Sequence, residues 1–167
     1  MFSKVELKQA LADELRLARH LALKLRDVDE GYCPGSKMRT LRELLGYLSV
    51  CALAPADALV KDDWGVISAW QERAKTVGKL GFDAAMAAQG EELAKLIDGI
   101  PAKEYGSREV GLPWGERVRL DRALFICPLR FLVAYRMQLF LYLKQAGQSE
   151  LNTYNAWMGQ DAPPAKK

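Results

Sequence analysis

Residues 121–146 constrain the fold more than any other part of the chain, because they are apolar on nearly every side of a helix. A helix of that kind is covered on most sides, so we expect a central element or a contribution to a subunit interface. Pro128 lacks a backbone N–H, which predicts a kink or one missing hydrogen bond. Arg130, Arg136 and Gln138 interrupt the apolar run and make membrane insertion costly, so we predict a soluble chain with no membrane partner.

Helix-start signals divide the rest of the chain. Three capping boxes, in which a hydroxyl precedes Glu or Gln by three residues, begin at Ser3, Thr40 and Ser68. After the first box, leucines and alanines recur at three- and four-residue steps. This pattern predicts an amphipathic helix over residues 4–27, with His20 exposed on its charged face.

The remaining segments also favour helices. A second helix begins after Thr40 and is expected to kink or end near Ala54, because Pro55 follows it. A short helix over 68–77 and an alanine-rich helix over 83–98 come next. Residues 99–120 form a Gly- and Pro-rich loop in which Val110 and Leu112 mark a brief extended stretch. The predicted fold is all-α: a four-helix bundle with a short extra helix and a long loop before the last helix.

Length and composition set the remaining limits. The 167 residues fit one domain, which we expect over residues 1–160, followed by a disordered tail over 161–167. Three cysteines form no CxxC pair and the N-terminus has no apolar signal core, which predicts a reducing, cytoplasmic location. The net charge of +3 is spread along the chain, so we expect no nucleic-acid partner.

Familiar catalytic motifs are missing from the sequence. It contains no phosphate-binding loop, no GxSxG and no HExxH, and its single histidine excludes a three-histidine metal site. A cysteine nucleophile would need a neighbouring base or cation, and Arg130 and Arg136 are the candidates near Cys127. Whether the protein is an enzyme therefore stays open.

Two segments carry a family resemblance: residues 38–48 (MRTLRELLGYL) and residues 131–144 (FLVAYRMQLFLYLK). They resemble motifs of the DinB family of helical bundles, also called YfiT-like metal-dependent hydrolases. Arg136 and Gln138 match an Arg-Gly-Gln motif on the family's last helix, and the loop LPWG at 112–115 is also similar. The resemblance covers nearly the whole chain and implies a four-helix bundle.

The resemblance also implies where a metal would lie, and there this sequence departs from the family. The three histidine ligands fall on Tyr47, Phe131 and Tyr135, and Met137 replaces the glycine of Arg-Gly-Gln. Phenylalanine has no lone pair, and a phenol with a pKa of about 10 is a poor ligand at neutral pH. A three-nitrogen zinc site cannot form, so we expect no metal and no cofactor.

Spacing places these positions near one another. Phe131 and Tyr135 lie one turn apart on one helix face, and a crossing second helix would add Tyr47. The cluster is either ordinary core packing or a pocket for a small apolar or aromatic ligand, with tyrosine hydroxyls as polar handles. The candidate pocket residues are Tyr47, Cys51, Cys127, Phe131, Tyr135 and Gln138.

The functional prediction follows from the resemblance and the departure together. We expect a DinB-like protein without a metal site that acts as a small-molecule-binding or structural homodimer. The alternative is a metal-dependent hydrolase or thiol S-transferase of the DinB/YfiT superfamily. The homodimer rests on the apolar segment 121–146 and on the pairing of bundle helices that the family implies.

Overall fold

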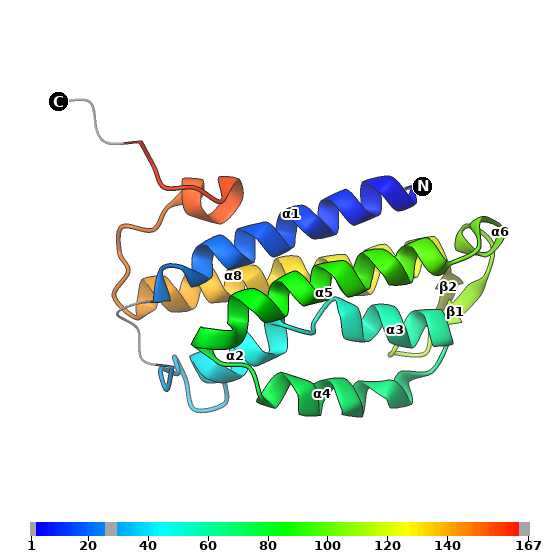
Figure 1. Cartoon of the computed structure of the whole chain (residues 1–167). Helices are drawn as coiled ribbons and strands as arrows, with labels where there is room; N and C mark the ends of the chain where they lie inside the picture. The colour runs from blue at the N-terminus through cyan, green and yellow to red at the C-terminus, as the bar shows by residue number, and fades with distance from the viewer. Residues whose placement is uncertain (1–2, 26–29, 164–167) are drawn as a thin grey trace.

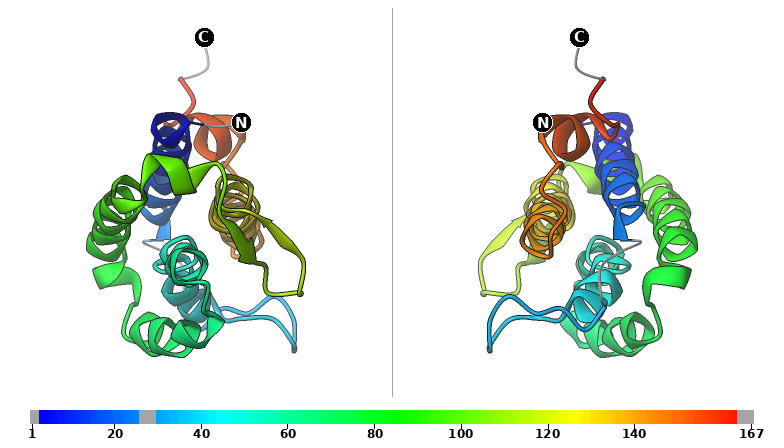
Figure 2. Two further views of the ribbon diagram at one scale, coloured as in Figure 1. Left: turned by 90° about the vertical axis from the view of Figure 1, so that its right-hand side faces the viewer. Right: turned by 90° about the vertical axis from the view of Figure 1, so that its left-hand side faces the viewer.

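Four helical runs surround one apolar core in the computed structural model, which describes residues 3–25 and 30–163. The runs are α1 (Lys4–Ala22), α2 (Leu41–Leu48) with α3 (Leu53–Lys61), α5 (Lys79–Gly99), and α7 (Leu120–Leu124) continued through a π-helical turn, η3 (Phe125–Leu129), into α8 (Arg130–Gln145). The end-on views of Figure 2 show these runs around the core, with α4 (Ile67–Lys75) outside them. The predicted all-α bundle with one extra helix is confirmed.

The first helix starts where the sequence indicates. Ser3 Oγ accepts a hydrogen bond from the Glu6 N–H (3.2 Å), and the Glu6 carboxylate accepts one from the Ser3 N–H (2.8 Å). The helix ends at Ala22, earlier than predicted, and residues 26–29 lie outside the described part. The placement of His20 on an exposed face is wrong: its side chain is only 14% exposed, because the C-terminal segment covers it.

The second helical run breaks before Pro55 rather than at it. α2 ends at Leu48 and α3 begins at Leu53, so Pro55 lies in the first turn of α3, where its missing N–H costs nothing. The fully buried Gln89 of α5 stabilises the break. Its Oε1 accepts from the N–H groups of residues 52 (3.0 Å) and 53 (3.2 Å), and its Nε2 donates to the Leu48 carbonyl (2.9 Å).

The extra helix has a different start from the predicted one. Asp63 caps a short 3₁₀ turn, η2 (Trp64–Val66), by accepting from the Gly65 N–H at 2.8 Å, and α4 continues from it. Ser68 therefore lies inside the helical run, where its hydroxyl donates to the Gly65 carbonyl (3.1 Å). The capping box expected at Ser68 does not form. α5 begins at Lys79, so it starts before the predicted boundary and includes Gly81.

The long loop contains the expected extended stretch. A short helix, α6 (Ala102–Tyr105), precedes a hairpin of β1 (Glu109–Gly111) and β2 (Arg117–Arg119). Asp62, at the end of α3, accepts from the Gly111 N–H (2.7 Å) and from Arg117 Nη2 (3.0 Å). These bonds hold the hairpin beside the C-terminal end of α3, as Figure 1 shows.

The last helical run is broken at the predicted proline, since Pro128 lies in the π-helical turn. By length and composition the run Leu120–Gln145 could cross a membrane, and the central helix of a bundle has the same composition. Gly147 ends the run with a φ of 107°. A second π-helical turn, η4 (Tyr154–Met158), packs on α1. Beyond it, Asp161 forms an ion pair with Lys24 of 2.5 Å. Residues 164–167 lie outside the described part.

Candidate functional site

A cavity of about 530 Å³ lies between the α2–α3 run, α4 and the start of the last helix. Its wall is mostly apolar and aromatic, with charged side chains at the rim. The lining residues are Arg39, Arg42, Glu43, Tyr47, Val50, Cys51, Ala54, Pro55, Trp64, Ile67, Trp70, Gln71, Ala74, Lys75, Val77, Pro113 and Phe131.

Helix α4 forms the outer wall because both of its ends are fixed. At its C-terminal end, a Cβ on Gly46 would lie 2.4 Å from the Ala74 carbonyl oxygen, so only glycine permits this approach of α2 to α4. At the other end, Trp64 Nε1 donates to the Gly111 carbonyl (2.8 Å).

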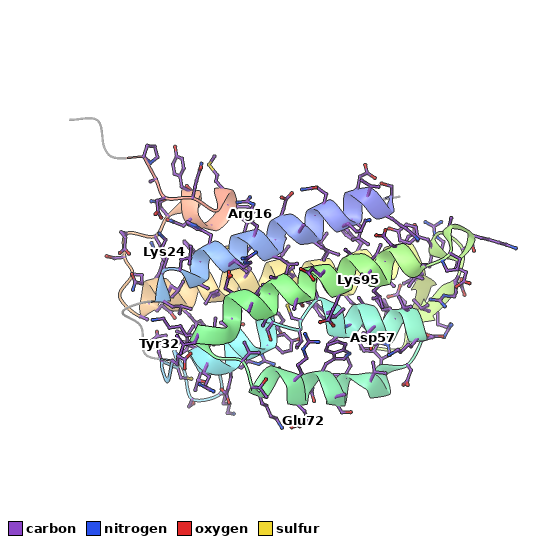
Figure 3. The ribbon with its side chains drawn as sticks, viewed as in Figure 1. Arg16, Lys24, Tyr32, Asp57, Glu72 and Lys95 are labelled. Atoms are coloured by element: carbon purple, nitrogen blue, oxygen red, sulfur yellow. The ribbon has the colours of Figure 1, made fainter. Side chains whose placement is uncertain are left out.

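Between these ends, Trp70 Nε1 donates to the Asp57 carboxylate at 3.0 Å. Figure 3 labels Asp57 on α3, on the side that faces α4, and Glu72 on the opposite, outer side of α4. Arg73 adds a bidentate ion pair from α4 to Glu92 of α5, with distances of 2.8 and 3.0 Å. α4 is therefore held in place over the cavity by polar contacts to three neighbouring elements, and none of its own residues is fully buried.

The structure brings four of the six predicted pocket residues together. Tyr47, Cys51 and Phe131 line the cavity. Tyr135 packs edge-on against Tyr47, with ring centroids 4.5 Å apart. Tyr47, Phe131 and Tyr135 are half-buried, whereas Cys51 is fully buried. The α2 run thus crosses the face of the last helix that carries residues 131 and 135.

The other two predicted pocket residues are not part of the cavity wall. Cys127 is buried within the π-helical turn. Gln138 lies farther along α8, where its Nε2 donates to the Tyr142 hydroxyl (2.9 Å). That hydroxyl in turn donates to the Arg39 carbonyl (3.1 Å), and Gln138 lines a neighbouring depression that shares Arg39 and Glu43 with the cavity rim.

Sequence reasoning missed Arg39, Trp64 and Trp70. The Arg39 guanidinium carbon lies 4.4 Å from the ring centroid of Tyr47 and 5.5 Å from that of Tyr135. Stacking of a guanidinium on aromatic faces is a stabilising cation–π contact. Arg39 lies in the resemblance segment 38–48, which was a usable signal, but the two tryptophans gave none because their wall depends on where α4 packs.

The cavity offers no activated nucleophile. Burial raises the pKa of the Cys51 thiol well above its ordinary value, and it raises the pKa of Cys127 to about 11. Burial, together with the neighbouring Tyr135, also raises the pKa of Tyr47. With these raised pKa values the two thiols and the Tyr47 phenol are neutral at pH 7. A neutral thiol is unreactive, because only the thiolate is a nucleophile or a metal ligand.

The residues at the family's ligand positions do not fit a metal ion. A neutral phenol and a phenyl ring supply no ligand that zinc prefers. Within residues 3–25 and 30–163, no three His, Cys, Asp or Glu side chains come close enough to hold an ion.

Arg136 faces away from the cavity. It is fully buried, and its Nε donates to the Glu14 carboxylate of α1 at 2.5 Å. Its Nη1 donates to the Ala156 carbonyl of the C-terminal turn, also at 2.5 Å. The ion pair with Arg136 explains why Glu14 lies beside the apolar stripe of α1. Because Arg136 is engaged there, it is not the cation that would activate Cys51 or Cys127 as a nucleophile.

Comparison with known proteins agrees with this architecture. No family model matches the chain, and no curated protein matches its sequence. Among solved structures, a DinB-like protein, YjoA from Bacillus subtilis, superimposes with a TM-score of 0.68 over 89% of this chain and 96% of that chain. The chain has the DinB-like fold. At 17% identity the likeness concerns the fold alone, and at that level it confirms the resemblance predicted from residues 38–48 and 131–144.

Proposed function

We propose that this DinB-like chain binds a small apolar or aromatic molecule in the cavity under α4. The observation that carries the proposal is a cavity of about 530 Å³ with an aromatic wall, at the positions where the resemblance puts the family's metal ligands. Ligand pockets are commonly about 300–1,000 Å³, mostly apolar, with few polar groups. Tyr47, Trp70 and Phe131 supply such a wall.

A thermal-shift screen over aromatic and apolar metabolites tests the proposal. Ligands that raise the melting temperature are expected to lose their effect in Ala74→Leu, because the larger side chain occupies the cavity. Ala69→Leu, an exposed position on the same helix, is the matched control and keeps the effect. A screen without any stabilising ligand, or hits that bind both variants equally, would contradict the proposal.

We also propose that this cavity binds no metal ion. It is supported by the side chains of Tyr47, Phe131 and Tyr135, which lack zinc-binding nitrogen atoms. Protein purified without chelator is expected to contain no stoichiometric metal, and one tightly held ion per chain would overturn this part. Histidines at all three positions are expected to create a zinc site with distances of roughly 2.0–2.1 Å, whereas histidines shifted by one residue are not.

We further propose that the protein is a homodimer that pairs through the outer face of α8. Leu141 is 53% exposed, and Trp157 and Met158 are 62% and 51% exposed. Trp157 and Met158 belong to η4, which packs on α1, and the Trp157 ring lies 5.5 Å from the guanidinium of the buried Arg136. The most apolar stretch of the run Leu120–Gln145 is 39% buried within one copy, and uncovered apolar surface on this scale is typical of interaction sites.

Light scattering at micromolar concentration is expected to give the mass of a dimer. Leu141→Glu should shift it to the monomer, because a carboxylate on that face opposes burial. Leu80→Glu is the control, since Leu80 is fully exposed on α5, away from the proposed face. A monomeric wild-type protein would refute the homodimer and leave the cavity proposal unaffected.

A further inference from the structure

One cation at the rim of the cavity, Arg39, forms no ion pair with any residue that the structure describes. Three basic side chains line the cavity, and two of them are paired: Arg42 with Glu30 (3.1 Å) and Lys75 with Glu72 (2.5 Å). Among residues 3–25 and 30–163, no carboxylate lies within ion-pair distance of the Arg39 guanidinium. Arg39 is also an exposed residue, so its positive charge is available to a ligand.

The acidic residue at the same rim is already engaged. The Glu43 carboxylate accepts hydrogen bonds from the Thr40 N–H (2.7 Å) and hydroxyl (3.0 Å), in the capping box that begins α2. Both bonds go to Oε2 of the Glu43 carboxylate. The Thr40 hydrogen bonds, followed by the Arg39 charge, lower the pKa of Glu43, but in the described part of the chain the two side chains form no ion pair, so the Arg39 donors stay accessible to a ligand carboxylate.

Arg39 is also held in a defined place. The Tyr142 hydroxyl, from a fully buried side chain, donates to its carbonyl, and its guanidinium stacks over Tyr47. A guanidinium ordered by stacking still presents its N–H donors at its edges. Those donors match the two oxygens of a carboxylate in a bidentate pair.

We infer that the molecule bound in this cavity is an aromatic carboxylate, whose carboxylate pairs with Arg39 while its ring lies against Trp70 and Phe131. This inference rests on the proposed ligand-binding function and adds the chemical class of the ligand. An anion at the rim neutralises the charge left by Arg39, and an aromatic body fills the apolar space between α3 and α4.

A pair of matched probes tests the inference: 2-naphthylacetate and 2-(2-naphthyl)ethanol, which share a ring system and differ in charge. Titration calorimetry with wild-type protein is expected to show about tenfold tighter binding of the acid, the size of one charge-assisted contact at a partly exposed site. Raising the salt concentration should weaken binding of the acid and leave binding of the alcohol unchanged.

The variant Arg39→Gln should reduce the affinity for the acid to that for the alcohol, without changing the affinity for the alcohol. Arg122→Gln, an exposed arginine outside the cavity, removes the same charge and should keep the tenfold preference. Equal binding of both probes to wild type, or a preference that survives Arg39→Gln, would overturn the inference and leave the proposed function standing. Failure of both probes to bind at millimolar concentration would count against the ligand-binding function itself.

Discussion

Gln89 holds the break between α2 and α3, so its replacement should destabilise the fold. Its amide makes three buried hydrogen bonds to the backbone of residues 48, 52 and 53. In Gln89→Met the side-chain volume is nearly kept, so the change removes the bonds without creating a large cavity. Three backbone groups then lose their partners, at a cost of about 1–3 kcal/mol for each group that water cannot reach.

Allowing for partial rescue by relaxation of the junction, we expect the free energy of unfolding to fall by about 3–5 kcal/mol, a large part of the typical 5–15 kcal/mol for a domain. Urea unfolding followed by circular dichroism measures it. Gln145→Met, the same change at an exposed position of α8, should stay within about 0.5 kcal/mol of wild type. A loss below about 1 kcal/mol in Gln89→Met would refute the assignment of the break to this side chain.

Three further predictions follow from single contacts. Gly46→Ala should destabilise the protein by about 1–3 kcal/mol in urea unfolding, because its Cβ meets a backbone oxygen of α4, whereas Gly81→Ala, with open space around it, should not. Arg136→Met should lower the free energy of unfolding by about 3–5 kcal/mol by leaving Glu14 unpaired, and the double variant Arg136→Met/Glu14→Leu should recover most of it. Burial, followed by the charge of Lys24, lowers the pKa of His20 in the folded protein, so the unfolded chain takes up this proton at a higher pH. The free energy of unfolding should therefore fall as the pH drops from about 7 through 6.5. His20→Gln should flatten this dependence in melting curves measured over that pH range.

Most of the bundle follows from local patterns in the sequence. The capping boxes at Ser3 and Thr40 form as their spacing predicts, because each needs only a hydroxyl and a carboxylate three residues apart. Pro128 breaks the last helical run, since a missing N–H acts locally wherever the helix lies. The meeting of Tyr47 with the face of residues 131 and 135 was also predictable, although only through the family resemblance.

The position of the break in the second run and the shape of the cavity depend on packing between distant segments. The break falls at residues 49–52, because a buried amide from α5 satisfies backbone groups there, and no local pattern near Pro55 reports that partner. The stacking of Arg39 over Tyr47 depends on Tyr142, about a hundred residues away, holding its carbonyl. α4 is placed over the cavity by Gly46 and by the Trp70–Asp57 bond. Such contacts join distant segments, so they exist only once the chain has packed.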